Sequence, residues 1–207
     1  MKRSLPVVPT LLVAALSIAT ALMLPVPVTY AIPITFVGIL TGANEVPPVA
    51  SLGTGNATVV LDPTAQTIQI NVTFSGLMSN DIGANIHCCA PLGTNVGAAT
   101  TVPAFPGFPL GVISGSYSSA VFDLTQPTIY NPAFVTMEGS IPAAEAALIA
   151  GIENGMTYLN IRTVNFPGGE IRSQLFPVPV PVPEPSSLVL LGCGLAGLAA
   201  WRRRQAA

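Results

Sequence analysis

The sequence is poor in charged, aromatic and metal-binding side chains. Of its 207 residues, 8% are charged and 6% are aromatic, and it contains three cysteines and one histidine. Lysine occurs once, at Lys2, near the start of the chain. Nucleic-acid binding needs clustered lysine or arginine to neutralise phosphates, so we expect no nucleic-acid partner. A glycine-rich phosphate loop and a second histidine to activate a nucleophile are also missing, so we expect no enzymatic activity.

Residues 32–181 form an acidic central segment. This segment has two arginines, Arg162 and Arg172, and eight carboxylates, so its formal charge is −6. The scattered carboxylates are Glu45, Asp62, Asp81, Asp123, Glu138, Glu145, Glu153 and Glu170. Because the carboxylates form no long tract, we interpret the charge as a solubility feature. We expect Glu170 to pair with Arg162 or Arg172. About 150 residues suffice for one domain with its own core.

The N-terminus has the pattern of a secretory signal peptide. Lys2 and Arg3 precede an apolar run over Thr10–Leu24, and Thr29-Tyr30-Ala31 places small residues at both positions that a signal peptidase reads. The pattern predicts a signal peptide over residues 1–31, cleaved after Ala31. A non-cleaved anchor is the alternative.

The C-terminus, residues 182–207, has three parts. Pro183-Glu184-Pro185 is followed by an apolar run over Ser186–Trp201 and then by Arg202-Arg203-Arg204. A run of about 16 residues is short for a permanent span, which needs roughly 20, and the arginines favour a cytoplasmic end. An ordinary single-span tail anchor is the alternative to the resemblance that follows.

This tail resembles the PEP-CTERM sorting signal of Gram-negative bacteria. The resemblance implies export, transient anchoring in the inner membrane through a transmembrane segment at residues 186–201, and cleavage near Pro-Glu-Pro by a membrane-embedded exosortase. The final location is then the cell surface or the extracellular space. Residues 177–183 alternate proline and valine and predict a polyproline spacer between a domain at residues 32–176 and the tail.

Short alternating segments bounded by turn residues dominate residues 32–176. Asn56–Leu61 and Thr67–Ser75, joined by Asp62–Gln66, predict an antiparallel hairpin. Further expected strands are Ile34–Leu40, Ala84–Cys88, Ser119–Leu124, Ala133–Gly139, Thr157–Val164 and Glu170–Phe176. About eight short strands predict an all-β fold, an antiparallel sandwich or barrel. One short helix is expected over Pro142–Glu153, with Ser140 near its start and Gly155 past its end.

A long segment rich in glycine, proline and threonine lies between Cys89 and Ser118. A loop of this length is usually functional or poorly ordered. Phe105 and Phe108, with Tyr117 nearby, form a contact patch if they are exposed. The alternative is that these rings fold back and fill the barrel.

Four pieces of residues 32–176 resemble the CHRD domain, which is named after repeats in chordin and occurs in bacterial secreted proteins. They are Gly42-Ala43-Asn44-Glu45-Val46-Pro47-Pro48-Val49, Val72-Thr73-Phe74-Ser75-Gly76-Leu77, Ile86-His87, and Tyr158-Leu159-Asn160-Ile161-Arg162-Thr163 with Phe166-Pro167-Gly168-Gly169-Glu170-Ile171-Arg172-Ser173-Gln174-Leu175. The resemblance implies a secreted β-rich module without established catalytic activity. The family commonly has His-Ile-His where this chain has Asn85-Ile86-His87, and two such histidines would share one face and chelate a metal.

His87, Cys88 and Cys89 are the remaining candidates for chemistry. Cys193 lies in the removable tail, so the exported domain keeps only the adjacent pair. Three states fit the sequence: a vicinal disulfide, free or intermolecularly paired thiols, and a copper or zinc site with His87. No other cofactor is expected.

Together these features predict a non-enzymatic exported module of the cell surface or extracellular matrix. Its expected partners are signal peptidase and exosortase during export, and then an extracellular protein or polysaccharide. The alternative is a metal-binding or redox protein that uses His87, Cys88 and Cys89.

Overall fold

The computed structural model describes residues 33–179 and, in the tail, the single residues 192, 195, 199, 202, 203, 205 and 206. The predicted signal peptide with its cleavage site Ala31 lies outside the described residues, as do Pro183, Glu184, Pro185 and Arg204. Among the residues described, no single helix is long and apolar enough to cross a membrane.

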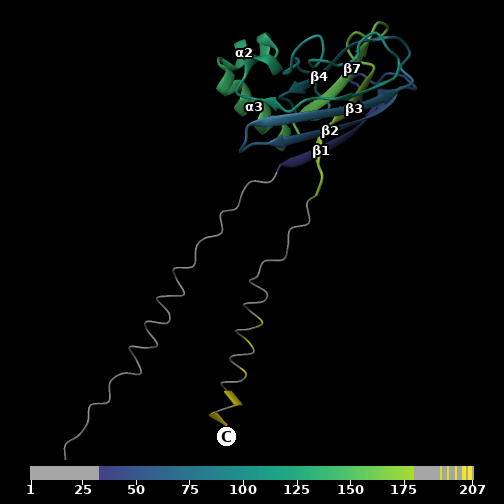
Figure 1. Ribbon diagram of the computed structural model, residues 1–207. Coiled ribbons are helices and arrows are strands. Elements are labelled where there is room, and N and C mark those ends of the chain that lie inside the picture. Colours follow the sequence, from purple (N-terminus) through teal and green to yellow (C-terminus); the bar gives the residue numbers. More distant parts are fainter. Residues whose placement is uncertain are drawn as a thin grey trace, which may run out of the picture. The chain divides into compact units, whose positions relative to one another are not determined.

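Nine antiparallel strands form one sheet that curls into a half-barrel (Figure 1). The strand order is β4-β7-β8-β1-β2-β3-β5, with β6 paired to β3 and β9 paired to β1. The strands are β1 Ile34–Thr41, β2 Thr54–Asp62, β3 Thr67–Ser75, β4 Asp81–Cys88, β5 Gly115–Ser118, β6 Phe122–Asp123, β7 Thr157–Thr163, β8 Ile171–Gln174 and β9 Phe176–Pro177. The predicted all-β class is confirmed.

The hairpin of β2 and β3 forms as the sequence predicts. Its strands pair from Thr54 opposite Ser75 to Asp62 opposite Thr67. The Asp62 carboxylate closes the turn, because its Oδ1 atom accepts the backbone N–H groups of Thr64 and Ala65 at 3.0 and 2.8 Å. Alternate residues of both strands are buried in the core, among them Val59, Leu61, Ile68, Ile70, Val72 and Phe74.

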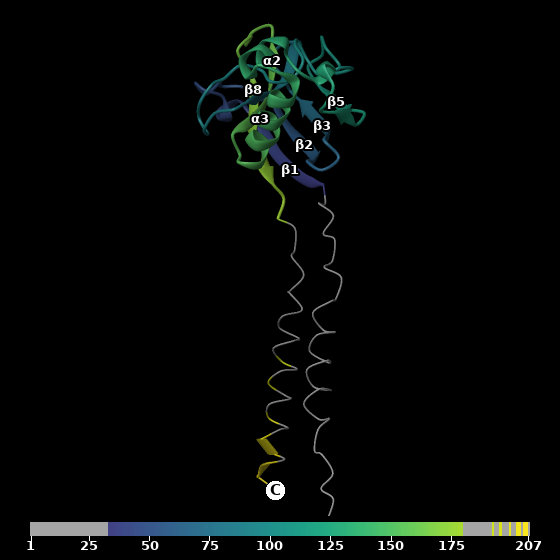
Figure 2. The ribbon, with the colours of Figure 1, turned by 90° about the vertical axis from the view of Figure 1, so that its left-hand side faces the viewer.

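Two α-helices lie together at one end of the sheet (Figures 1 and 2). Helix α3, Ile141–Glu153, is the predicted helix, with Ser140 capping its first turn. Helix α2, Pro132–Glu138, occupies the segment predicted as the strand Ala133–Gly139, so that prediction was wrong. The local cause is a strong pair of helix ends: Asn131 caps the first turn, Pro132 follows it, and Gly139 adopts the left-handed conformation at the end.

The predicted strand Ser119–Leu124 forms only in part. Strand β5 ends at Ser118 and β6 covers only Phe122–Asp123, leaving a break between them. At the break, the Ser119 side-chain hydroxyl accepts the backbone N–H of Ile70 at 2.9 Å. A side chain therefore substitutes for a backbone partner and interrupts the ladder.

The long segment after Cys89 runs along the free edge of β4. Single bridges join Ala84 to Ala104 and His87 to Ala98, and the N–H groups of Ala99 and Thr100 donate to the carbonyl of Ile86. The segment therefore covers backbone groups that an edge strand would otherwise expose.

The aromatic side chains of this region point inward. Phe105, Phe108 and Tyr117 are 2%, 7% and 7% exposed, and the Phe105 and Tyr117 rings stack with centroids 5.9 Å apart. Phe108 stacks on Phe74 of β3 at 5.6 Å. The three rings therefore do not form an exposed contact patch. They fill the half-barrel, because burying an apolar ring in the core lowers the free energy relative to leaving it in water.

Candidate functional site

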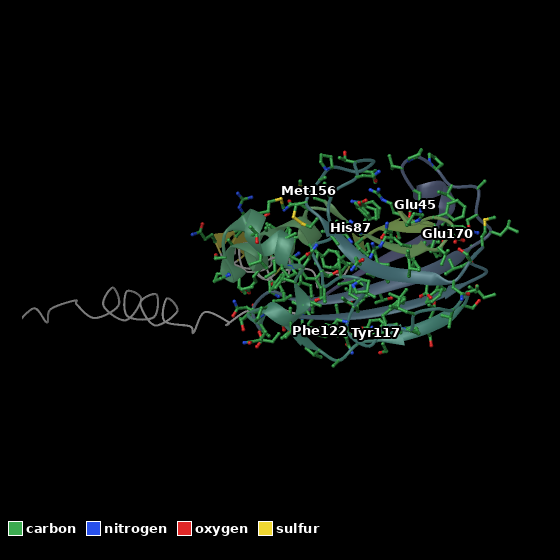
Figure 3. The ribbon with its side chains drawn as sticks, turned by 90° about the horizontal axis from the view of Figure 1, so that it is seen from above. Glu45, His87, Tyr117, Phe122, Met156 and Glu170 are labelled. Carbon is green, nitrogen blue, oxygen red and sulfur yellow. A yellow bond between two sulfur atoms is a disulfide. The ribbon has the colours of Figure 1, made fainter. Side chains whose placement is uncertain are left out.

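The outer face of β4, β7 and β8 is polar and largely covered: four of its polar side chains are buried, and His87 and Arg162 are half-buried. Strand alternation turns Ile86, Leu159 and Ile161 into the core and sends their neighbours to the opposite face. We call the outward set the buried polar face: Asn85, His87, Tyr158, Asn160, Arg162 and Arg172. Figure 3 shows His87, Glu45 and Glu170 on one side of the domain, and Tyr117 and Phe122 on the opposite side.

A stack of three side chains forms the centre of this face. The rings of His87 and Tyr158, which are opposite each other on β4 and β7, are parallel within 7° with centroids 4.6 Å apart. On the other side of the Tyr158 ring, the guanidinium carbon of Arg172 lies 3.4 Å from the ring centroid. A buried guanidinium over an aromatic face is a favourable cation–π arrangement.

The Arg172 guanidinium also has two hydrogen-bond acceptors in the covering segment. It donates from Nη1 to the Asn95 side-chain oxygen at 2.7 Å and from Nη2 to the Thr94 carbonyl at 3.1 Å. The side chain is 2% exposed, and burial lowers its pKa from the ordinary value. Arg172 thus fastens the segment at residues 94–95 to β8.

Both ring nitrogens of His87 face oxygen atoms of the fold. Nδ1 donates to the Val96 carbonyl at 2.7 Å, and Nε2 lies 3.1 Å from the Asn160 side-chain oxygen. Burial lowers the pKa of His87, and the contact with the Val96 carbonyl opposes that shift. Neither nitrogen is directed at a position shared with the cysteines.

Cys88 and Cys89 are joined by a disulfide bond. Cys88 lies against helix α3, where a Cβ atom on Gly151 would overlap its sulfur and would lie 3.0 Å from the sulfur of Cys89. Their sulfur atoms are 3.6 and 3.3 Å from the Ala147 carbonyl oxygen. A cavity of about 320 Å³ adjoins the pair on the side of Phe134 and Met137.

The structure does not assemble His87, Cys88 and Cys89 as metal ligands. His87 faces the outer side of β4, Cys88 faces helix α3, and disulfide sulfurs are not the thiolates that copper or zinc binds. Among the described residues, no three His, Cys, Asp or Glu side chains lie close enough to hold a metal ion.

Glu45 follows the short helical turn Gly42–Asn44 and carries a buried carboxyl group. It is 6% exposed, and its Oε1 atom has no hydrogen-bond partner among the described residues. A Cβ atom on Gly169 would overlap the carboxyl group, so only glycine fits there. Burial raises the pKa of Glu45 to about 7, although the nearby Arg172 guanidinium opposes the shift.

Glu170 is fully buried, and its hydrogen bonds differ from the ion pair that the sequence led us to expect. Its carboxylate accepts the Ser51 hydroxyl at 2.6 Å, the Met78 N–H at 2.7 Å and the Thr163 hydroxyl at 2.7 Å. The expected partner Arg162 instead donates to the Asn85 side chain at 2.8 Å and to the Pro103 carbonyl at 2.7 Å. Glu170 therefore ties three separate segments together.

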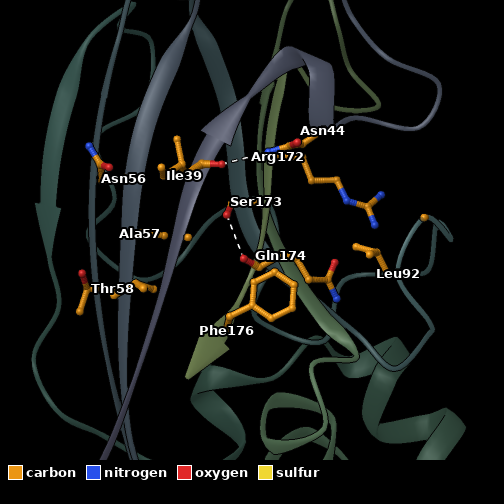
Figure 4. A pocket seen from close by; sticks show the side chains of 13 residues that line it. Ile39, Asn44, Asn56, Ala57, Thr58, Leu92, Arg172, Ser173, Gln174 and Phe176 are labelled. Carbon is orange, nitrogen blue, oxygen red and sulfur yellow. Dashed lines mark hydrogen bonds between the residues drawn. The ribbon is translucent and has the colours of Figure 1, made fainter. Parts of the chain in front are cut away.

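A groove of about 750 Å³ opens where β8 meets β1 (Figure 4). The two strands pair only at Thr41 and Arg172, and β9 takes over the pairing at Phe36 and Val37. The groove is lined by the apolar side chains of Val37, Ile39, Leu92 and Phe176, by the uncharged polar ones of Asn44, Asn56, Thr58, Ser173 and Gln174, and by Arg172. Gln174 is 8% exposed, and its Oε1 atom has no partner among the described residues.

Sequence reasoning found His87 but missed the residues around it. Tyr158, Asn160 and Arg162 alternate along β7, so the sequence pattern alone places them on one face. The pattern did not reveal that this face is buried. His87, Arg162 and Arg172 hydrogen-bond to asparagine side chains and to backbone carbonyls of the domain, an arrangement that suits a rigid scaffold.

Comparison with known families agrees with this architecture. Residues 36–175 match the family model of the CHRD domain, and residues 181–204 match the PEP-CTERM protein-sorting motif. No curated protein and no solved structure matches the chain.

Proposed function

The chain belongs to the CHRD domain family and carries a PEP-CTERM sorting motif, and from this premise we propose that it is a non-enzymatic contact module of the bacterial cell surface or extracellular matrix. The motif implies export and processing by an exosortase in Gram-negative bacteria. The observation that carries the proposal is this motif, at residues 181–204, behind a domain that matches the CHRD family model.

Two features support a non-enzymatic role. Neither family is an enzyme family. Catalysis by general acid and base needs ionisable groups that reach a substrate, whereas Glu170 and Arg172 are buried and bonded within the fold. The domain then acts through its surface, with its signal peptide and its membrane segment at residues 186–201 serving export.

The sorting step is tested with changes in the tail. In cells that carry an exosortase system, Glu184→Ala, and separately replacement of Arg202, Arg203 and Arg204 by alanine, should make the longer, unprocessed protein accumulate. Glu153→Ala, in the exposed end of α3, is the matched control and should be processed normally. Normal processing of both tail variants would refute exosortase-dependent sorting.

A second candidate is thiol–disulfide exchange, favoured by the disulfide beside the cavity of about 320 Å³. Cys89 is the more exposed residue of the pair. An external dithiol would attack it, break the Cys88–Cys89 bond, and leave as a disulfide while the domain keeps both thiols. Exchange that disappears in Cys89→Ser would favour this role.

A further inference from the structure

The outer face of β1, β2, β3 and β5 is largely solvent-exposed, and it carries a single charge, at its end. Asp62, at the end of β2, is the one charged residue in these four strands, all of which the structure describes. Surfaces of soluble proteins normally mix both signs of charge. These four strands offer no cation, so the face has no ion-pair partner for anionic polymers.

The polar side chains of this face lie in straight rows across the strands. Strand pairing aligns one row, which we call row one: Ile39, Asn56, Thr73 and Ser116. It aligns a second row in the same way: Val37, Thr58, Asn71 and Ser118. Each row begins with an apolar residue on β1 and continues with three hydroxyl or amide side chains.

Most of these side chains retain free hydrogen-bonding capacity. Within residues 33–179, the side chains of Asn56, Thr73 and Ser116 form no intramolecular hydrogen bond, whereas Ser118 donates to Asn71 at 2.6 Å. Adjacent strands are about 4.8 Å apart, so a row of four spans roughly 14 Å. The spacing of one strand is close to the length of one pyranose unit in an extended chain.

The rows lead directly into the groove between β1 and β8. Asn56 and Thr58 line both that groove and a smaller hollow over β3 and β5. At the groove end, Ile39 is 66% exposed and Phe176 is 52% exposed. Exposed apolar side chains beside hydroxyl and amide groups suit a sugar ring, which has an apolar C–H face and a hydroxyl rim.

We propose that this face binds an uncharged polysaccharide, whose chain lies across β1, β2, β3 and β5 along the rows and enters the groove beside Phe176. The inference rests on the proposed contact function and names the chemistry of the partner. Hydroxyl groups of the sugar replace water on Asn56, Thr73 and Ser116, while Ile39 and Phe176 contact ring C–H groups.

The test is native electrophoresis of the full-length protein in gels containing a polysaccharide, with a zwitterionic detergent that carries no sugar. The probes are dextran, galactomannan and hydroxyethylcellulose, which are uncharged, and alginate, which is anionic. At least one uncharged polymer should slow the wild-type protein, and Thr73→Lys in row one should weaken that retardation about ten-fold. Thr64→Lys, in the exposed hairpin turn, adds the same charge away from the rows and should bind like wild type.

Melting temperatures of the two variants verify that both are folded. Retardation by alginate alone, no retardation by any polymer, or equal effects of Thr73→Lys and Thr64→Lys would overturn the proposal. A change of oligomeric state in Thr73→Lys without polymer binding would overturn it in favour of contact between copies of this chain. This assay does not depend on processing of the tail, so its result is independent of whether the sorting proposal holds.

Discussion

Gly151 of helix α3 lies directly against the sulfur of Cys88 in strand β4, with no room for a methyl group between them. The disulfide and the glycine are complementary in shape: a compact pair of bonded sulfurs on the sheet meets the one helix position without a side chain. This contact fixes how closely the helical end approaches the curled sheet.

Gly151→Ala should destabilise the protein, although alanine normally favours a helix by about 1 kcal/mol. The added methyl group overlaps the Cys88 sulfur, and overpacking of a core typically costs about 1–3 kcal/mol. Urea unfolding measures the effect. Removing the sulfurs with Cys88→Ala and Cys89→Ala in the same chain should recover part of the loss, and a Gly151→Ala protein more stable than wild type would contradict the close contact.

The peptide containing Cys88 and Cys89 should remain unlabelled by a thiol reagent until the protein is reduced. The disulfide leaves neither sulfur as a thiolate, which is the reactive form. Peptide mapping by mass spectrometry after labelling separates this pair from Cys193 in the tail. Labelling of the pair without a reductant would favour the free-thiol state, and stoichiometric copper or zinc lost in His87→Ala would favour the metal state.

Glu45→Gln should remove part of the pH dependence of stability. The pKa of Glu45 is about 7 in the folded state and close to 4.5 in an unfolded chain, so folding favours the protonated form. The protonated Glu45 side chain makes its full contribution to the stability of the folded protein below pH 4.5, and this contribution is lost as the pH rises to about 7.

Urea unfolding at about pH 5 and about pH 8 should therefore show a decrease in wild-type stability that is smaller in Glu45→Gln. The exposed-site control Glu153→Gln should keep the wild-type decrease. Equal decreases in all three proteins would show that the Glu45 carboxyl group is not the titrating group.

Glu170→Ala should be strongly destabilising, by more than about 3 kcal/mol, whereas Glu170→Gln should cost much less. Alanine leaves the Ser51 hydroxyl, the Met78 N–H and the Thr163 hydroxyl without their acceptor, and each unsatisfied buried group costs about 1–3 kcal/mol. Glutamine keeps one oxygen for Ser51 and Met78 and offers an N–H group to the Thr163 hydroxyl. Thermal and urea unfolding compare the variants, and a stable Glu170→Ala protein would argue against a structural role.

Sequence patterns correctly predicted those helices and strands whose conformation is decided by residues close together in the chain. The hairpin of β2 and β3 was correct because alternation and the Asp62 turn act within a few residues. Helix α2 was misassigned because Val135 and its apolar neighbours resemble a strand, while the decisive information lay in Asn131, Pro132 and Gly139 at its ends.

The sequence by itself determined the β class, the hairpin of β2 and β3 and, through the family resemblance, the CHRD domain and the sorting motif. It also determined which polar residues share a face, because alternation in a strand has a local period of two. Only the tertiary structure decided that the face with His87 and Arg172 is covered while the rows at Asn56 and Thr73 are open. That choice depends on how the sheet curls and where residues 89–114 lie, and these are set by contacts between residues far apart in the chain.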